Sequence, residues 1–417
     1  MKKKVLLIIT GSFPYNYCKE DSFIMPEIKY YSSYFDKVVF VPNYKIGEKA
    51  KLYNDIDSTD TLANLTERGY SFKHLFTYEF ILLFKEVILN FFTKRIYNFN
   101  SIKYILSHFL NAKICQEWLN NYLTKFTDYN ITIYTYWCDH NTTGICFEKV
   151  KKRNSISVVS RSHGADLYEE RNNFGFIPFR KFVIGSIDRF IPISNSGLQY
   201  INALYPKNKS SFIFSRLGVK KNIEFNELAI KSNSGLTIVS CSSVINLKRV
   251  DLIYTSLKFF SDTYKVKVDW HHFGGGSDLE LLNNAINSDL TDCNLLDITL
   301  HGNVENNFIL NFYKEFYIDL FINLSIYEGI PVSIMECQSF GIPVIATNVG
   351  GMNEIVYNGL NGFLLKQNPS IHEVAEIIYQ YTKERKSTDF QKNSYNNWLY
   401  NFNENINFPQ FLTQIQF

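Results

Sequence analysis

The sequence predicts an α/β protein made of two doubly wound domains. Its 417 residues exceed what one ordinary hydrophobic core holds, and they suit two domains of about 200 residues each. Hydrophobic residues make up 46% of the chain and charged residues 20%, which is typical of a globular protein rather than a disordered or fibrous one. Strand patterns alternate with helix patterns in both halves of the chain, which favours two parallel sheets covered by helices.

The first alternation begins with an apolar strand at residues 5–10, which ends at Gly11. A helix over 22–35 and a strand over 38–41 complete a βαβ opening. The lysine-rich start is not a signal peptide, because the apolar run that follows it holds only five residues. Further strands of this half are expected at 131–136, 157–160 and 189–193.

Residues 80–123 read as a helical region rich in Phe, Tyr, Ile and Lys. Its longest hydrophobic run, 81–92, contains Lys85, Glu86 and Asn90 and is too short to span a bilayer. A basic, aromatic helix of this kind could lie on a membrane surface. For most of the region we favour the alternative, in which the helix covers the sheet with its apolar face inward.

A polar stretch at 220–234 forms the expected linker, and a second alternation follows it. Helices are expected at 250–260 and 278–287, with a glycine-rich turn at 274–276 between them. The strands of this second sheet are expected at 236–240, 265–273, 297–301, 318–323 and 343–347.

The net charge of +3 hides an asymmetry between the two halves. Residues 1–225 carry 31 Lys and Arg against 20 Asp and Glu, a difference of +11, whereas the rest of the chain carries 12 against 20, a difference of −8. The basic half should therefore face an anionic partner, such as a phospholipid surface or a polyprenyl-diphosphate acceptor. Nucleic acid is the less favoured partner, because no RNA-binding signature or recognition-helix pattern accompanies the charge.

Neither cysteines nor acidic clusters predict a metal site. The seven cysteines are scattered and never form a Cys-x-x-Cys motif, so we expect buried thiols in a reducing cytosol. Asp55-Ile56-Asp57 is the only Asp-x-Asp sequence, and its polar surroundings indicate a solvated turn. With no His/Cys ligand set for zinc, we expect no metal and no cofactor.

The most informative stretch runs from Glu328 to Glu336, two carboxylates separated by a Gly-x-Pro turn and the start of a helix. Pro331 suits the first helical position and Gly341 suits the C-terminal stop, so the sequence predicts a helix over 331–340. Within this helix Ser333 and Glu336 share one polar stripe among apolar side chains.

This arrangement suits a phosphorylated sugar carrier. The free backbone N–H groups and the positive dipole end over residues 330–333 favour an anionic ligand. The carboxylates of Glu328 and Glu336 can each accept hydrogen bonds from paired sugar hydroxyls.

Residues 240–365 resemble the retaining nucleotide-sugar glycosyltransferases of family 4, which have the GT-B fold. The resemblance rests on Lys248-Arg249-Val250-Asp251-Leu252, Asp319-Leu320-Phe321-Ile322-Asn323, the 328–336 motif, Gly341-Ile342-Pro343 continuing to Gly350-Gly351, Glu354-Ile355-Val356 and Asn358-Gly359-x-Asn361-Gly362. The first half resembles bacterial capsule, O-antigen and exopolysaccharide members through Gly11-x-Phe13-Pro14-Tyr15, Arg161-Ser162-His163-Gly164-Ala165-Asp166-Leu167-Tyr168 and Ser215-Arg216-Leu217-Gly218-Val219.

The resemblance implies two facing Rossmann-like domains with an interdomain cleft. Residues 1–222 would bind the acceptor, and residues 223–393 would bind the nucleotide-sugar donor. A C-terminal helix over 394–417 would cross back to the first domain.

The resemblance also implies a role for each candidate residue. Glu336 would bind the donor ribose hydroxyls, Glu328 would hold the transferred sugar, and Lys248 would neutralise the departing diphosphate. Backbone groups of Gly329, Ile330, Pro331 and Ser333 would meet the donor sugar and diphosphate. The base pocket is expected at Gly302 and Val304 and at the turn after Phe273.

On the acceptor side, loops leave the C-terminal ends of parallel strands, where α/β proteins place ligands. His163 would contact the donor sugar or the acceptor, with Asp166 orienting its ring. Gly11 and Tyr136 are the other acceptor-side candidates in these loops. A lone His after a strand is more often a structural residue, and the resemblance is what favours the functional role here.

One position departs from the family pattern. The family has an arginine five residues before the lysine, and this chain has Ser243 there. Arg249 is the candidate that compensates, although adjacent residues on a helix point in different directions.

These observations predict a retaining, metal-independent hexosyltransferase that uses a nucleoside-diphosphate sugar and a lipid-linked or oligosaccharide acceptor in bacterial surface polysaccharide synthesis. We expect a cytoplasmic protein, peripheral on the inner face of the cell membrane. Two alternatives stay open: another GT-B enzyme, such as a nucleotide-sugar epimerase or a phosphorylase, and a non-catalytic GT-B binding partner. The sequence leaves the base, sugar, acceptor, linkage and oligomeric state undetermined.

Overall fold

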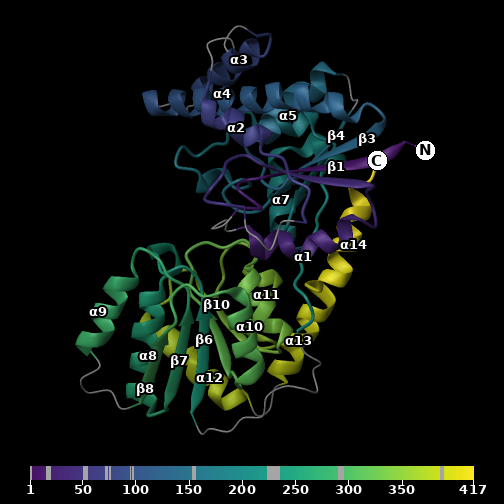
Figure 1. The fold of residues 1–417 in the computed structure, drawn as a ribbon. Helices are drawn as coiled ribbons and strands as arrows, with labels where there is room; N and C mark the ends of the chain where they lie inside the picture. Colours follow the sequence, from purple (N-terminus) through teal and green to yellow (C-terminus); the bar gives the residue numbers. More distant parts are fainter. Residues whose placement is uncertain are drawn as a thin grey trace. The chain divides into compact units, whose positions relative to one another are not determined.

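The computed structural model describes residues 2–15, 20–49, 55–70, 74, 77–93, 95, 98–152, 156–222, 235–289, 295–385 and 389–417. Its contacts divide the chain into two compact units, and each of them holds one parallel sheet (Figure 1). The first unit comprises Met1–Ser215 and Phe408–Phe417, and the second comprises Arg216–Asn407. The division therefore falls at 215/216 and at 407/408, where we expected it at 222/223 and 393/394.

The first sheet has five parallel strands in the order β2-β1-β3-β4-β5. Their bounds are β1 Lys3–Thr10, β2 Lys37–Pro42, β3 Tyr129–Thr135, β4 Ile156–Ser162 and β5 Arg189–Pro192. The five strands that the sequence predicts for this half are confirmed to within two residues at each end. The strand order reverses between β1 and β3, and doubly wound sheets bind ligands beyond the strand ends at such a point.

Alternate residues of these strands feed two hydrophobic cores, one on each face of the sheet. Leu7 and Ile133 belong to the core that also contains side chains of α2 (Thr61–Arg68), α4 (Phe99–Tyr122), α5 (His140–Lys151), α6 (Arg180–Ser186) and α7 (Asn195–Leu204). Leu6 and Ile8 belong to the opposite core, with α1 (Asp21–Tyr31) and the end of α14 (Glu404–Gln414). The two ends of the chain lie near each other in the first unit (Figure 1).

The predicted helical region 80–123 is two helices, α3 (Phe80–Phe92) and α4. Asn98 begins α4, because its side chain accepts a hydrogen bond from the backbone N–H of Ser101 at 2.9 Å. Together α3, α4 and α6 enclose a small separate core around Leu83, Phe109 and Phe179.

The second sheet has six parallel strands in the order β11-β10-β9-β6-β7-β8. Their bounds are β6 Leu236–Cys241, β7 Val268–Phe273, β8 Leu296–Leu300, β9 Leu320–Asn323, β10 Val344–Thr347 and β11 Gly362–Leu365. This is the strand order of a dinucleotide-binding fold, and its switch point lies between β6 and β9.

Helices cover both faces of this sheet. The core around Ile238, Trp270 and Ile322 also contains side chains of α8 (Val250–Tyr264), α9 (Leu279–Asp289), α12 (Ile371–Glu384) and α13 (Phe390–Asn401). This unit also holds α10 (Asn306–Glu315) and α11 (Val332–Ser339), and most of their apolar side chains are buried.

Several expectations need correction. Strand β7 begins at Val268 rather than at 265, and the single C-terminal helix over 394–417 is two helices, α13 and α14. The sequence did not predict α2, α5, α6, α7, α10, α12 and β11. Most of the expected linker, 223–234, lies outside the described residues.

Five cysteines lie in the described part of the chain, and all five are free thiols: Cys115, Cys138, Cys146, Cys241 and Cys337. Cys18 and Cys293 lie outside the described residues. Across the described residues, the structure contains no helix that is both long and apolar enough to cross a bilayer.

Candidate active site

The two most informative charged residues of the sequence meet at the switch point of the second sheet. Lys248 lies in the loop that leaves β6, and Glu328 lies in the loop that leaves β9. These strands are neighbours in the sheet although about 80 residues separate them in the chain. Because both loops start at the carboxyl ends of parallel strands, the fold brings the two side chains to the same edge.

The Lys248 ammonium donates a hydrogen bond to Oε1 of Glu328. The same oxygen accepts from Oγ of Ser325 at 2.7 Å and from Nδ2 of Asn323 at 3.5 Å. The Glu328 side chain is only 11% exposed and that of Lys248 21%. The carboxylate is thus held in a fixed orientation by three donors from two loops.

Arg249 does not extend the positive charge of Lys248 toward this carboxylate. Its guanidinium donates to the backbone oxygens of Leu324 at 2.5 Å, Ser325 at 3.2 Å and Gln367 at 2.8 Å. Arg249 also adopts a left-handed backbone conformation, with φ of 48°, at the start of α8. It therefore clamps the loops after β9 and β11, and its compensation for Ser243 at the diphosphate stays a prediction.

The helix predicted at 331–340 is α11, Val332–Ser339. Pro331 has an extended backbone and precedes the helix, so it is one position earlier than expected. Gly341 ends the helix as predicted: it has φ of 73°, and the N–H of the next residue, Ile342, reaches back to the oxygen of Cys337 at 3.1 Å. The oxygen of Gly329 accepts from the N–H of Gly351 at 3.0 Å, which fixes the turn before the helix.

Glu336 lies in α11 with only 9% of its surface exposed. Oε1 accepts a hydrogen bond from Nδ2 of Asn306, the first residue of α10, at 2.8 Å. Burial raises the pKa of Glu336 to about 7, against the lowering effects of Asn306 and of the positive charge of Lys220. A glutamate that is half protonated near neutral pH can either donate or accept a hydrogen bond to a hydroxyl.

The predicted base pocket, Gly302 and Val304, lies in the loop between β8 and α10. Gly302 has φ of 65°, and its oxygen accepts from the N–H of Gly274 at 2.8 Å, which joins this loop to the glycine-rich turn after β7. The ring of His301 stacks on Phe273, with centroids 4.4 Å apart and planes 10° from parallel. The loop leads directly to Asn306 and so to Glu336.

In the first unit, His163 follows β4 and its ring contacts two neighbouring aromatic rings. The centroid distances are 5.3 Å to Tyr136 and 4.4 Å to Trp137. Nδ1 of His163 lies 3.7 Å from Oδ2 of Asp166, whose Oδ1 accepts from the backbone N–H groups of His163 at 2.8 Å and Gly164 at 3.0 Å.

The contacts of Asp166 favour its ionised form. Burial opposes ionisation of Asp166, but its hydrogen bonds with His163 and Cys138 and the charge of His163 lower its pKa below the usual value. Asp166 is therefore an ionised anchor that orients the loop and the histidine ring.

Tyr136 is fully buried, so its expected contact with the acceptor is corrected. It lies under His163 and beside the buried guanidinium of Arg161, which pairs with Glu27 of α1. Tyr136 supports the histidine ring and does not reach a ligand in this arrangement.

Gly11 lies where β1 ends, and its surroundings reveal a residue that the sequence reading missed. The Glu20 carboxylate accepts hydrogen bonds from the backbone N–H groups of Gly11 at 2.9 Å, Ser12 at 2.8 Å and Phe13 at 3.0 Å, and from the Trp137 indole at 2.5 Å. Glu20 thus ties the loop after β1 to the loop after β3 across the switch point. Nothing in the local sequence pattern distinguishes Glu20 from an ordinary helix-start glutamate.

The candidates therefore form two groups, one in each unit. Lys248, Glu328, Gly329 and the start of α11 come together in the second unit, and Asn306 links Glu336 to the loop of Gly302 and Val304. Gly11, His163, Tyr136 and Asp166 come together in the first unit. Among the described residues, no group of three or more His, Cys, Asp or Glu side chains is arranged to hold a metal ion.

The second unit is similar to proteins of a known family. Residues 222–397 match the model of the family described as glycosyl transferases group 1. An Escherichia coli UDP-Gal:alpha-D-GlcNAc-diphosphoundecaprenol alpha-1,3-galactosyltransferase is 34% identical over 79 residues, which are 19% of this chain and 20% of that protein. An uncharacterised glycosyltransferase of Methanocaldococcus jannaschii is 28% identical over 220 residues, 52% of this chain and 57% of that protein. The chain thus spans between a fifth and just over half of the length of these curated relatives.

Solved structures match the chain over its whole length. The apo form of the lipopolysaccharide outer core galactosyltransferase WaaB superposes with a TM-score of 0.69 at 12% identity, covering 99% of both chains. Anabaena HepE in complex with UDP superposes with a TM-score of 0.66 at 13% identity, also covering 99% of both chains. Identities this low establish the fold alone. The chain therefore has the GT-B fold over its full length, and its residues 222–397 are similar to the group 1 glycosyl transferases.

Proposed function

We propose that the protein is a retaining glycosyltransferase, which moves a hexosyl group from a nucleoside-diphosphate sugar to a sugar hydroxyl of a lipid-linked glycan in bacterial surface polysaccharide synthesis. The observation that carries the proposal is the Lys248–Glu328 pair at the switch point of the second sheet. An ammonium and an oriented carboxylate at that edge suit a ligand that combines phosphate charge with sugar hydroxyls.

Each residue of the pair would act on a different part of the donor. The Lys248 ammonium would stabilise the negative charge that grows on the departing diphosphate. Glu328, held by Ser325 and Asn323, would accept hydrogen bonds from the transferred sugar and fix its position. Glu336, beside Asn306, would accept hydrogen bonds from the ribose hydroxyls.

The reaction balances without a metal or cofactor. The bond between the anomeric carbon and the phosphate oxygen breaks, and its electron pair leaves with the nucleoside diphosphate. The acceptor oxygen bonds to the same carbon on the same face, and its proton passes to the departing phosphate oxygen. Lys248 is the group that takes the place of a metal ion in balancing the charge.

The comparisons support, but do not decide, the chemistry of donor and acceptor. The E. coli relative is named for a UDP-galactose donor and a diphosphoundecaprenol-linked acceptor, and the HepE structure contains UDP. We therefore propose UDP-sugars as the first donors to test and a polyprenyl-diphosphate glycan as the acceptor class. The first unit would bind that acceptor near His163, at the switch point closed by Glu20 and Trp137.

An acceptor carried by a lipid requires the enzyme to work at a membrane. We propose peripheral association with the inner, anionic face of the cell membrane, since the basic charge of the chain lies in its first 225 residues.

A donor panel tests this function directly. Thermal midpoints are measured with UDP, GDP, ADP and their sugar conjugates, because a ligand that binds the folded state raises the midpoint by mass action. A transferase should respond to one nucleoside diphosphate and its sugar, and it should release that diphosphate only when a glycan acceptor is present. Release without acceptor and without a new glycan product would favour a nucleotide-sugar epimerase, whereas sugar 1-phosphate formed from a glycan and inorganic phosphate would favour a phosphorylase. Binding with no transfer, unchanged in Glu328→Gln, would favour a non-catalytic partner.

A further inference from the structure

Helix α3 of the first unit exposes large apolar side chains, although Leu83 packs into the core on its inner side. A surface helix of a globular protein presents charged and polar side chains to solvent and apolar ones to the core. In the segment from Tyr78 to Phe92 the arrangement is largely reversed. Eight large hydrophobic side chains are exposed, by between 38% and 77%: Tyr78, Phe80, Ile81, Phe84, Ile88, Leu89, Phe91 and Phe92.

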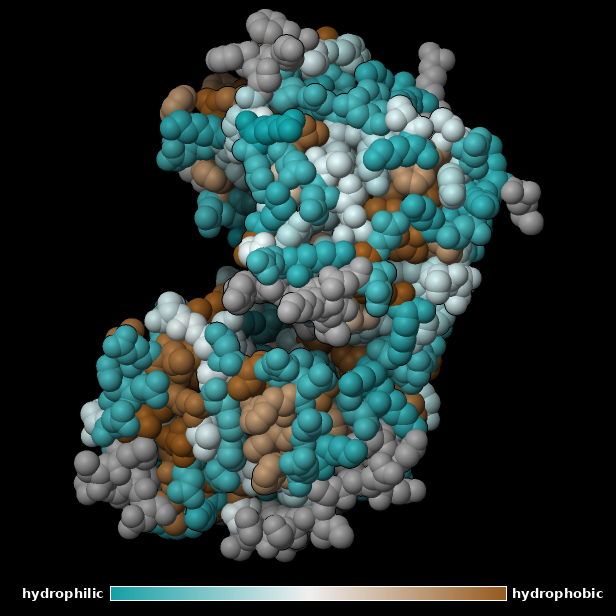
Figure 2. All heavy atoms as spheres, in the orientation of Figure 1, coloured by the Kyte–Doolittle hydropathy of each residue, from teal (hydrophilic) through white to brown (hydrophobic). Residues whose placement is uncertain are grey.

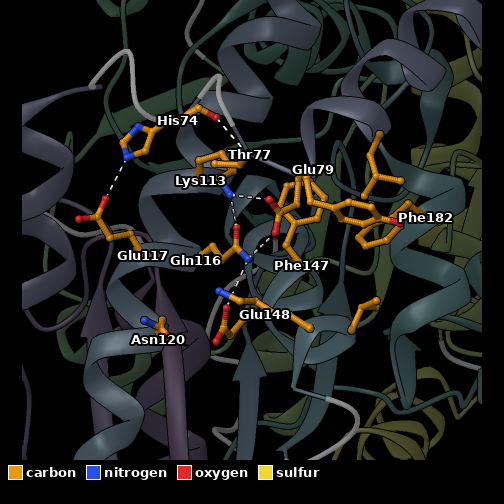
Figure 3. Close-up of a pocket in the computed structure, with 14 residues that line it drawn as sticks. His74, Thr77, Glu79, Lys113, Gln116, Glu117, Asn120, Phe147, Glu148 and Phe182 are labelled. Atoms are coloured by element: carbon orange, nitrogen blue, oxygen red, sulfur yellow. Dashed lines mark hydrogen bonds and ion pairs between the residues drawn. The ribbon is translucent and has the colours of Figure 1, made fainter.

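Three polar side chains of the same segment, Glu79, Glu86 and Asn90, face the protein, whereas Lys85 is exposed. Glu79 accepts hydrogen bonds from Lys113 at 2.9 Å and from Gln116 at 2.8 Å, both on α4 (Figure 3). These three side chains line an open pocket of about 650 Å³, to which α5 and α6 contribute Phe147 and Phe182.

Farther along the helix, Glu86 accepts from the backbone N–H of Phe179 at 2.9 Å and from the side chain of Asn90, also at 2.9 Å. Burial raises the pKa of Glu86. Asn90 itself is only 2% exposed. The polar groups therefore anchor the inner side of α3 and fix which face points outward.

The exposed apolar side chains form one patch and are not scattered singly. Of the 25 large hydrophobic side chains that are exposed in the described part of the chain, ten lie between Tyr78 and Ile102: Tyr78, the seven of α3, and Phe99 and Ile102 at the start of α4. In the view of Figure 2 some hydrophobic atoms are visible at the end of the first unit that carries α3 and α4. A patch of this size and composition marks a surface that another apolar phase covers.

The charges around the patch indicate which phase that is. Lys85 is exposed on α3, and the Lys103 ammonium lies 4.9 Å from the ring of Phe99. The two acids of the segment, Glu79 and Glu86, are turned inward, so the outer face carries cations and aromatic rings without an opposing carboxylate. Aromatic and aliphatic side chains beside lysines are the composition of a helix that lies in the interface of an anionic bilayer.

We propose that the outer face of α3, together with Phe99 and Ile102, inserts into the surface of an anionic lipid bilayer. The inference rests on the proposed peripheral association and names the surface responsible for it. With 13 residues α3 is about 20 Å long, too short to span a bilayer and suited to lying along its surface.

The first test compares binding of the full chain to vesicles of phosphatidylcholine alone and of phosphatidylcholine mixed with phosphatidylglycerol. The wild type should sediment with the mixed vesicles. The double variant Phe84→Ser/Phe91→Ser should bind at least about tenfold more weakly, since each exposed ring loses its burial in the lipid. Lys85→Glu should weaken binding to the mixed vesicles selectively. The matched control is Leu281→Ser, which removes a side chain that is 70% exposed on α9 of the other unit and should bind as the wild type does.

A second measurement reports insertion itself. Phe84→Trp places an indole on the patch, and its fluorescence should be quenched by brominated lipids, whereas Leu281→Trp in the same vesicles should not gain quenching over the wild type. Equal thermal midpoints of wild type and variants show that the fold is kept.

The outcomes separate the inference from the proposed function. If the wild type binds the mixed vesicles and the double variant binds equally, the assignment to α3 is overturned and peripheral association stands. If the wild type binds neither vesicle but self-associates, and the double variant is monomeric, the patch is covered by a second copy and the inference is overturned. Absence of both vesicle binding and self-association overturns the inference and the peripheral association together, without touching transfer to a soluble acceptor.

Discussion

The Lys248 ammonium and the Glu328 carboxylate form an ion pair between the loops that leave β6 and β9. The pair neutralises both charges in a place where each side chain is at least three-quarters buried. A bound diphosphate would add negative charge beside the ammonium, and a bound sugar would add donors beside the carboxylate. Both partners of the pair are therefore matched to the two halves of the proposed donor.

Lys248 should be needed for the chemical step. Lys248→Ala should lower kcat about 10² to 10³-fold, because the charge that develops on the departing diphosphate loses its counter-ion. Lys248→Arg should recover part of the rate, since it restores the charge with a different geometry. Steady-state kinetics with the donor found in the panel measure both variants. Lys258→Ala, which removes a lysine paired with Asp289 on the surface of the same unit, is the control and should keep the wild-type rate. A wild-type kcat in Lys248→Ala would remove this residue from the mechanism.

Glu336 and Glu328 should fail in different ways. Glu336→Ala should weaken binding of the nucleoside diphosphate about tenfold or more, because a buried acceptor of ribose hydroxyls is lost. Glu328→Ala should keep the nucleoside diphosphate affinity and lower turnover about 10²-fold or more, because the sugar is no longer positioned. Calorimetric titration gives the affinities, and Glu315→Ala, an exposed carboxylate at the end of α10, should change neither quantity. Equal losses of affinity and turnover in the two variants, together with lowered thermal midpoints, would point to structural roles instead.

Glu336 should also make stability depend on pH. Its pKa is about 7 in the folded chain against 4.5 in the reference state, so between these values the folded chain keeps a proton that the unfolded chain has lost. Its contribution to the free energy of unfolding is about 3 kcal/mol. This contribution is fully present below about pH 4.5 and is lost as the pH rises through 7.

The comparison with Glu336→Gln isolates this effect, because glutamine does not titrate. The thermal midpoint of the wild type should fall relative to that of Glu336→Gln as the pH is raised from 5 to 8. A difference between the two midpoints that stays constant over this range would contradict the assigned pKa.

Arg249 should matter for stability rather than for the donor. Arg249→Lys should lose the fork of hydrogen bonds to Leu324, Ser325 and Gln367, which we expect to destabilise the second unit by about 2 to 4 kcal/mol. Nucleoside diphosphate affinity, measured well below the unfolding temperature, should stay close to that of the wild type. An unchanged thermal midpoint with a large loss of affinity would instead place Arg249 at the diphosphate.

The sequence predicted every strand of the two sheets except β11, because apolar runs that are buried in a sheet carry strong local signals. Helices such as α5 were missed since their sequences, here His140–Lys151, contain Asn, Thr and Gly and little apolar periodicity. Their helical state depends on burial against the sheet and on the Asp139 side chain that caps α5.

Some residues of the candidate site could also be predicted from the sequence, and others could not. The 328–336 motif and Lys248 were visible as sequence patterns, and the parallel sheet brings them together. Partners that act across long chain separations, such as Glu20 on Trp137 and Asn306 on Glu336, were not visible, because only the tertiary fold determines which loops meet. Tyr136 was misplaced for the related reason that a single sequence does not show which aromatic residue near a strand end is covered by its neighbour.

The most direct test of the central claim is the anomeric configuration of the product, followed by ¹H NMR during transfer from an α-linked nucleoside-diphosphate sugar. The coupling constant of the anomeric proton distinguishes the two products as they form. If the acceptor enters on the face from which the diphosphate leaves, as proposed for the site of Lys248 and Glu328, the first product is the α-glycoside. The nucleoside diphosphate then appears with it in equal amount. A β-linked first product would contradict the account.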